Sequence, residues 1–262
     1  MRPHRQWMAM TTTDFTGDMS RWVAVVPTAA VEQHGPHLPV GTDTMIAEGM
    51  LAETLKQLPD DLPATFLPVQ SIGKSNEHLS YPGTLTFDFD TVIRAWVSVG
   101  ESVARAGVRR IVFINSHGGN TALLDVVARE LRVRLNMLAV HTHWMRFGDG
   151  GAVSDAENAV GIHGGMLETA LIKHFRPELV REPEAQDFPS RQSELVEKYE
   201  HLRIHGGHAF GWMSEDLNPA GVVGDASAAT APMGATIAIH QAAGFVQLLR
   251  EMSDVDLPFL AD

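Results

Sequence analysis

Histidines beside acidic and glycine residues are the main chemical feature of this sequence. Thirteen histidines occur in 262 residues, and several lie in short clusters: EQH at 32–34, SHGGN at 116–120, IHGGMLE at 162–168 and IHGGH at 204–208. Histidine is the commonest metal ligand and the usual acid–base group near neutral pH. The chain has no cysteine, which excludes disulfides, thiolate ligands and thiol nucleophiles. We therefore expect a metal centre built from imidazole and carboxylate groups.

Four of these side chains have a spacing that suits two metal ions. Glu32 and His34 are separated by one residue, so in extended chain they project to the same side. Asp43 follows at the start of a predicted helix, and His117 precedes a Gly-Gly turn. A carboxylate can bridge two ions ~3.5–4 Å apart, and we assign that role to Asp43. Nitrogen and oxygen ligands suit Zn²⁺ or Mn²⁺, so we expect two such ions per subunit, Zn and/or Mn.

Other histidines leave alternatives open. His163 is either a site residue or a hydrogen-bonding residue in the fold. His141 and His143 also have a spacing of two and form a rival metal site, although no acidic partner lies near them in the sequence. His205 and His208 lie in a glycine-rich stretch, and we interpret them as loop or interface residues.

The elements that must position these groups alternate along the chain. Short, valine-rich apolar runs predict buried parallel strands at 22–27, 64–69, 110–115 and 137–141. Amphipathic segments predict helices at 44–57, 90–106, 120–135, with Asn120 at the N-cap, and 232–252. This alternation predicts an α/β fold with a parallel sheet covered by helices. Ligands bind beyond the carboxyl ends of such strands, where the polar clusters fall.

Composition restricts partners and location. The formal net charge of -12 and scattered basic residues argue against nucleic-acid binding. No apolar run approaches the ~18 residues needed to span a bilayer, and the N-terminus lacks the apolar segment of a signal peptide. We expect a cytoplasmic protein with no membrane partner and a single domain over residues 1–262. Residues 181–228 are expected to form long loops.

Five spaced motifs resemble those of the creatininase (creatinine amidohydrolase-like) family. They are PTAAVEQHGPHLPVGTDT (27–44), SNEHLSYPGTLTF (75–87), INSHGGNTA (114–122), HGGMLETAL (163–171) and GVVGDASAATAPMG (221–234). The resemblance implies a three-layer α/β/α fold, two divalent ions and a homo-oligomer, a hexamer built as a trimer of dimers. It also implies that Glu32, Asp43 and His117 bind one ion, while His34 and Asp43 bind the other. Ser75 matches a substrate-contacting serine, and His163 matches a histidine that contacts substrate and assists proton transfer.

The chain departs from true creatininases at positions that hold creatinine. Gly119 stands where they carry a glutamate ligand, and Gly118 where they carry a tyrosine. Ala159 and Val160 stand at about the positions where true creatininases carry a tryptophan and an aspartate. Glu168 is the candidate replacement ligand, with a salt bridge or an acid–base role as its alternatives. The aromatic side chain that contacts creatinine in true creatininases either has no counterpart here or is replaced by Trp144 or Trp212.

We therefore predict a dinuclear metal-dependent amidohydrolase, a member other than true creatininase. A metal-bridging hydroxide would cleave a C–N bond in a small amide, lactam, cyclic imide or formamide. His163, or Glu168 if it is not a ligand, would protonate the leaving nitrogen. His78 and Asn120 are candidates, with Ser75, for binding the small-molecule substrate. Processing of a peptide partner by a metallopeptidase and hydrolysis of creatinine itself are the alternative functions.

Overall fold

A parallel sheet of four strands forms the centre of the computed structural model, which describes residues 5–256. The strands are β1 (Val23–Thr28), β2 (Ala64–Phe66), β3 (Arg110–Asn115) and β4 (Leu138–His143), in the order β2-β1-β3-β4. Every neighbouring pair in this sheet is parallel. The whole of β1 is buried, as expected for a strand with apolar residues on both faces.

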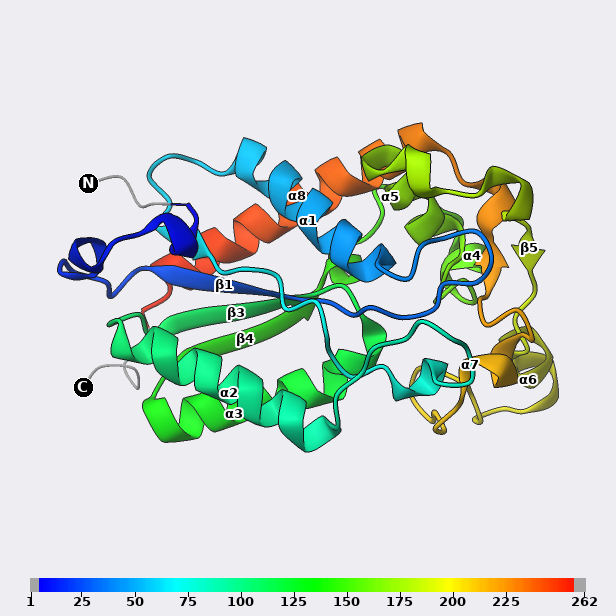
Figure 1. Cartoon of the computed structure of the whole chain (residues 1–262), viewed down its shortest axis with the longest axis horizontal. Helices are drawn as coiled ribbons and strands as arrows, with labels where there is room; N and C mark the ends of the chain where they lie inside the picture. The colour runs from blue at the N-terminus through cyan, green and yellow to red at the C-terminus, as the bar shows by residue number, and fades with distance from the viewer. Residues whose placement is uncertain (1–4, 257–262) are drawn as a thin grey trace.

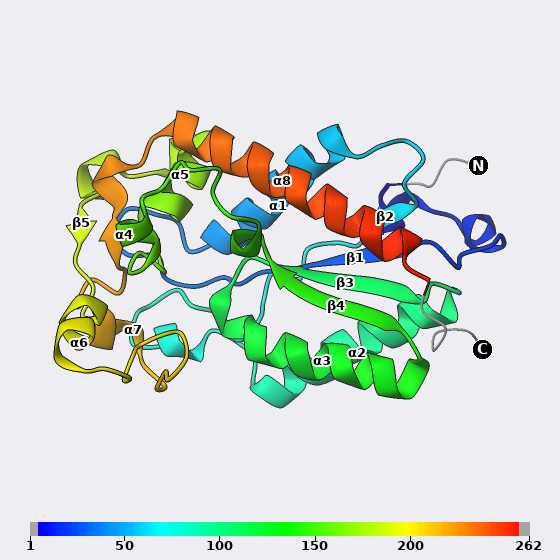
Figure 2. The ribbon, with the colours of Figure 1, turned by 180° about the vertical axis from the view of Figure 1, so that it is seen from behind.

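Helices cover both faces of the sheet and give three layers (Figure 1). One layer holds α1 (Thr42–Gln57), α5 (Met166–Phe175) and α8 (Ala231–Asp254), and the reverse view shows α8 running along the sheet (Figure 2). The other layer holds α2 (Phe89–Arg105) and α3 (Thr121–Leu135). The predicted α/β class, with a mainly parallel sheet between helices, is confirmed.

Successive residues of β1 point to opposite faces of the sheet and pack against different helix layers. Val23 and Val25 belong to the apolar cluster beneath α1, α5 and α8, whereas Ala24 and Val26 belong to the cluster beneath α2 and α3. This follows from the two-residue period of a strand. An apolar core therefore packs against each face of the sheet. The carboxyl ends of the strands, from which the site loops begin, are held in place by this packing.

Some predicted element ends differ from those in the structure. β2 ends at Phe66 rather than Val69. Leu67 N–H still donates to the Val25 carbonyl oxygen, but Pro27 of β1 has no N–H to return a bond. Gln70 pairs again with β1 just beyond it. Asn120 precedes α3, but its side chain does not cap the helix; it turns toward other loops. Asn120 therefore stands at the N-cap position of α3, as predicted, but makes no capping hydrogen bond.

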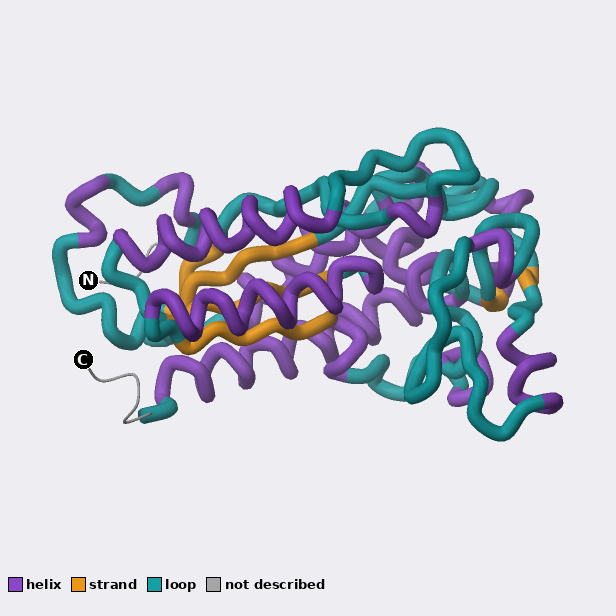
Figure 3. Tube along the Cα trace, turned by 90° about the horizontal axis from the view of Figure 1, so that it is seen from below, coloured by secondary structure: helices purple, strands orange, loops and turns teal. Residues whose placement is uncertain are grey.

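Loops and short elements gather beyond the carboxyl ends of the strands, at the end of the molecule opposite the two termini (Figures 1 and 3). They include α4 (Asp155–Asn158), α6 (Gln192–Lys198), α7 (Ser214–Leu217) and the antiparallel pair β5 (Asp187–Phe188) and β6 (Gly224–Asp225). The segment 181–228 thus contains mostly loop, as predicted, together with short elements. Among residues 5–256, no helix has both the length and the apolar character needed to cross a bilayer.

Candidate metal centre

The predicted ligands meet at the carboxyl end of the sheet. Glu32 and His34 lie in the loop after β1, Asp43 is in the first turn of α1, His117 follows β3, and Glu168 is in the first turn of α5. Their ligand atoms form two groups, Glu32–Asp43–His117 and His34–Asp43–Glu168, and within each group all atoms lie within 4.8 Å of one another. Asp43 belongs to both groups, as a bridging carboxylate would.

The contacts within each group join an imidazole nitrogen to carboxylate oxygens. His117 Nδ1 lies 3.1 Å from Glu32 Oε2 and 3.2 Å from Asp43 Oδ2. His34 Nε2 lies 3.3 Å from Asp43 Oδ1 and 3.6 Å from Glu168 Oε2. These spacings leave each imidazole nitrogen facing two oxygens around one small space.

Backbone carbonyls orient both imidazole rings. His34 Nδ1 contacts the Glu32 carbonyl oxygen at 3.1 Å, and His117 Nε2 contacts the Lys74 carbonyl oxygen at 2.8 Å. Because a carbonyl can only accept, each of these nitrogens donates its proton outward and the inward nitrogen of a neutral ring carries a lone pair. Lone pairs aimed at carboxylates repel unless a cation lies between them, and such outward bonds are typical of metal-binding histidines.

Unpartnered buried atoms fit the same interpretation. His34 Nε2 and Asp43 Oδ2 are buried and make no hydrogen bond to any described residue. Burial opposes a charge on His34, but Asp43 and Glu168 raise the pKa of this imidazole well above its usual value. Glu32 and Asp43 do the same for the pKa of His117. The carboxylates therefore create a strongly negative site, and its nitrogen and oxygen donors fit Zn²⁺ or Mn²⁺.

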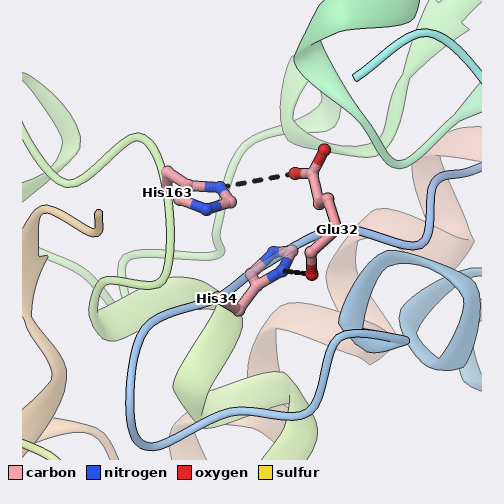
Figure 4. Close-up of side chains that lie close together, drawn as sticks. All are labelled: Glu32, His34 and His163. Atoms are coloured by element: carbon pink, nitrogen blue, oxygen red, sulfur yellow. Dashed lines mark hydrogen bonds and ion pairs between the residues drawn. The ribbon is translucent and has the colours of Figure 1, made fainter. Parts of the chain in front are cut away.

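His163 lies beside the predicted ligands, between two other imidazole rings. Its ring centroid is 4.2 Å from that of His34 and 4.2 Å from that of His78. Nε2 donates to the Gln33 carbonyl oxygen at 2.8 Å, which leaves Nδ1 as an acceptor 3.5 Å from Glu32 Oε1 (Figure 4). Burial and His34 lower the pKa of His163 to about 3, so the neutral ring is favoured.

Gln33 fixes the same Nε2–H tautomer in His78 as in His163, but in His78 this proton points toward the site. Its Oε1 accepts from the Gly35 N–H, so its amide nitrogen faces the Gly221 carbonyl at 2.6 Å and His78 Nδ1 at 2.8 Å. His78 Nδ1 therefore accepts, and Nε2 carries the proton 3.5 Å from Glu32 Oε1. Burial lowers the pKa of His78 and keeps it neutral. An imidazole acceptor and an imidazole donor thus face the same carboxylate.

Two glycines let the site loops approach each other. Gly35 and Gly164 have φ values of +65° and +68°, a left-handed conformation in which most side chains are strained. A Cβ at Gly164 would lie 2.5 Å from Val222 Cγ1. The Gly164 N–H donates to Glu168 Oε2 at 2.6 Å, so this turn also orients the Glu168 carboxylate.

A cavity of ≈ 370 Å³ opens onto these groups. Its polar lining includes Glu32, Asp43, His117, His163 and Glu168. Met145, Ile162 and Trp212 also line it and supply apolar surface. A substrate in this cavity would meet both the carboxylate and imidazole groups and apolar side chains.

The structure adds cavity residues that were not assigned to the site from the sequence. Glu77 has its Oε1 3.6 Å from His117 Nε2, and His143 and His205 line the cavity. His205 stands in IHGGH, and its first four residues repeat those at 162–165, which is a signal in the sequence. Its Nε2 is buried without a hydrogen bond to any described residue. The two histidines of the rival metal site do not come together: His143 lines the cavity, whereas His141 Nε2 lies 3.7 Å from Asp125 Oδ1 of α3.

Three candidate residues, Ser75, Asn120 and Trp144, are not among the residues that line the cavity. Asn120 is fully buried: Oδ1 accepts from Lys74 N–H at 2.9 Å and Nδ2 donates to the Ala29 carbonyl oxygen at 3.0 Å, so its amide joins loops. Ser75 is also fully buried and donates its hydroxyl to Glu32 Oε2. Trp144 packs edge-on against Phe245 in the core and supplies no aromatic contact in the cavity; Trp212 is the tryptophan at the cavity.

The substituted position Gly119 has no room for a side chain. A Cβ there would lie 2.4 Å from Glu77 Oε1 and 2.6 Å from the Lys74 carbonyl oxygen. Glycine is therefore matched to the close approach of Glu77 and Lys74. Glu168 reaches the His34–Asp43 group from another segment of the chain.

Comparisons with known proteins place this chain among related hydrolases. A family model described as creatininase, creatinine amidohydrolase, matches residues 8–249. The mycofactocin precursor peptide peptidase of Mycolicibacterium smegmatis is 30% identical over 217 residues, which cover 82% of this chain and 79% of that protein. The creatinine amidohydrolase of Pseudomonas putida is 27% identical over 184 residues, covering 64% and 69%. A solved creatininase mutant of Zn–Zn type has a TM-score of 0.73 at 22% identity and covers 95% of this chain and 98% of that one.

Proposed function

The chain belongs to the creatininase family of amidohydrolases, and we propose that it hydrolyses a C–N bond in a small amide with the help of two divalent metal ions. One observation carries the proposal. Two groups of buried ligand atoms share Asp43 and lie beside an imidazole acceptor, His163, and an imidazole donor, His78. The zinc–zinc creatininase of the same fold supports Zn²⁺ as an occupant, and the donor set also accepts Mn²⁺.

We assign the first ion to Glu32, Asp43 and His117 and the second to His34, Asp43 and Glu168. When bound, such ions polarise a carbonyl group and lower the pKa of water from 15.7 toward about 7. The short contact between Ser75 and Glu32 and the Gly164 N–H bond to Glu168 hold two of the carboxylates in place. Carboxylates held in this way are suited to binding metal ions rather than protons.

The chain's own groups supply the proton transfers. His163 Nδ1 is an acceptor that faces Glu32, so it can take the proton released as water attacks the carbonyl carbon. The same nitrogen then donates this proton to the leaving nitrogen, which becomes the amine of a hydrolysed formamide or lactam or the carboxamide of an opened imide. Its Nε2–H stays bonded to the Gln33 carbonyl throughout and holds the ring in position. His78 Nε2–H is a donor to the substrate oxygen.

The cavity favours a small amide, lactam, cyclic imide or formamide with an apolar part. Met145, Ile162 and Trp212 offer a contact surface for that part. A second candidate is cleavage of a peptide bond near the end of a peptide partner. The mycobacterial peptide peptidase supports this candidate, because its similarity extends over 82% of the chain.

A substrate screen of the zinc- or manganese-loaded protein tests the proposal. The panel should contain lactams, cyclic imides, formamides and short peptides, with the carboxylic acid product as the readout, because every one of these substrates yields it whereas an opened imide yields a carboxamide and no amine. Metal-dependent turnover of a non-peptide amide supports the first function, and turnover of peptides alone supports the second. The absence of turnover across the panel, with two ions bound, would contradict both.

We also propose that the chain forms a homo-oligomer, with the hexamer as the expected state. Large apolar side chains at Leu79, Leu85, Phe87 and Phe89 are exposed along one short segment, and Val40 is exposed as well. Exposed apolar side chains of this kind suit a subunit interface. Light scattering coupled to gel filtration would measure the mass, and a monomer at micromolar concentration would contradict the proposal.

A further inference from the structure

His143 occupies the carboxyl end of β4; it was a candidate ligand only in the rival pair with His141, and it belongs to none of the ligand groups that the described residues form. It lines the cavity that contains the metal-binding candidates. Its Nδ1 accepts a hydrogen bond from the Met145 N–H at 3.1 Å and so caps the short 3₁₀ helix Trp144–Phe147. Its Nε2 makes no hydrogen bond to any residue in the described range 5–256.

The cap decides which nitrogen of His143 carries the proton. A backbone N–H can only donate, so Nδ1 must present its lone pair to Met145. Burial lowers the pKa of His143 to about 4, and the ring is neutral at pH 7. The remaining proton is therefore on Nε2. His163 has the same tautomer, but the Gln33 carbonyl uses its Nε2–H, so its Nδ1 lone pair is left toward Glu32 instead of a donor.

The sheet places His143 beside, rather than within, the group of ligands. His143 pairs in register with Asn115 of β3, and His117 follows that strand. Neighbouring strands are ~4.8 Å apart. His143 also belongs to none of the groups of possible ligand atoms within residues 5–256, although it lines the same cavity, so a donor there would meet a part of the substrate other than the scissile carbonyl.

We propose that His143 is a specificity residue whose Nε2–H binds a second acceptor oxygen of the substrate, beside the amide that is cleaved. The inference rests on the proposed hydrolase function and narrows its substrate class. Cyclic imides and peptides carry a second carbonyl oxygen near the scissile bond, whereas simple lactams do not. Substrates with two acceptors are therefore the preferred class.

Two substitutions separate substrate binding from helix capping. In His143→Asn the amide oxygen can replace Nδ1 as the cap, but the donor into the cavity is lost; in His143→Gln the amide nitrogen can replace Nε2, but the cap is lost. With a matched pair such as succinimide and 2-pyrrolidinone, or the best imide and lactam of the screen, we expect His143→Asn to lower kcat/KM for the imide by ~10–100-fold. The lactam should change far less, and His143→Gln should recover most of the loss.

Equal losses on both substrates, or activity kept in His143→Asn and lost in His143→Gln, would overturn the proposal. His141→Asn, on the same strand but directed toward Asp125, is the matched control and should leave both rates unchanged. Melting temperature and metal content of every variant should match the wild-type protein. A loss of ions in His143→Asn would make His143 a ligand and would also overturn the proposal.

A second readout needs no turnover. In zinc-loaded, ¹⁵N-labelled protein at pH 7, the His143 ring should give the Nε2–H tautomer, and added succinimide should shift that resonance more than 2-pyrrolidinone does. An Nδ1–H tautomer, an imidazolium or equal shifts would refute the inference. If no amide or peptide is hydrolysed while the tautomer and the selective shift are found, the proposed function fails and the binding role of His143 stands.

Discussion

Replacing Asp43 by Asn tests the shared ligand directly. Asp43 Oδ1 lies 3.3 Å from His34 Nε2 and Oδ2 lies 3.2 Å from His117 Nδ1, so one carboxylate serves both groups. Asn keeps the shape of the side chain but replaces one oxygen by an NH₂ group and removes the charge. We expect Asp43→Asn to bind neither ion tightly and to lose hydrolysis.

The size of the effect can be measured as thermal stability. An ion present at 100 times its Kd adds about 2.7 kcal/mol to the free energy of unfolding. For a chain of about this size, 1 kcal/mol corresponds to ~2–4 °C in melting temperature, so two ions should raise it by roughly 11–22 °C. In Asp43→Asn this metal-dependent rise should nearly vanish. Each variant is compared with its own metal-free form, because the substitution also changes the contacts with His34 and His117.

Two further variants make the test specific. Glu48→Gln removes an exposed carboxylate from the same helix and should keep the full rise. Glu168→Gln should keep the ion at Glu32–Asp43–His117 and about half the rise. Differential scanning calorimetry and elemental analysis give both quantities. Two ions retained by Asp43→Asn, with a rise close to that of the wild-type protein, would refute the bridging role.

Three other outcomes are expected. His163→Ala should keep both ions and slow hydrolysis by ~10²–10⁴-fold; because Glu32, His34 and His163 also form a possible ligand group, metal loss in this variant would identify His163 as a ligand instead. Creatinine should be a poor substrate, with kcat/KM well below ~10⁴ M⁻¹s⁻¹, because Gly118 and the residues near Ala159 lack the gripping side chains; steady-state kinetics at or above that value would contradict the argument. The metal-free protein should lose stability as the pH falls from ~6.5 toward 4, since folding holds the pKa of His143 at about 4 and that of His163 at about 3 while the unfolded chain takes up protons first. His34, with its raised pKa, adds a smaller opposite slope only near pH 6.5, because below about pH 5.5 it is protonated in both states; urea unfolding that shows higher stability at pH 4 than at pH 6.5 would contradict this account.

The fold class could be predicted because local patterns carry it. A strand buried on both faces needs unbroken apolar residues, as in β1, and the intervening helices show one apolar face. The family could be recognised because its motifs follow one another along the chain, and the match over residues 8–249 confirms it. The element ends were less certain, since the end of β2 depends on its bonds to β1 and the side chain of Asn120 bonds to other loops instead of capping α3.

The amino-acid sequence by itself determined which chemical groups are available and that most of them follow buried strands: carboxylates and imidazoles, without thiols. Only the tertiary structure decided how they face one another. It brought Glu168 to His34, turned Trp144 into the core, and placed His143 and His205 at the cavity. It also selected the protonated nitrogen of each imidazole, because that choice depends on whether a distant carbonyl or a backbone N–H meets the ring. Such partners are set by the path of other loops, and residue spacing along the chain does not encode them locally.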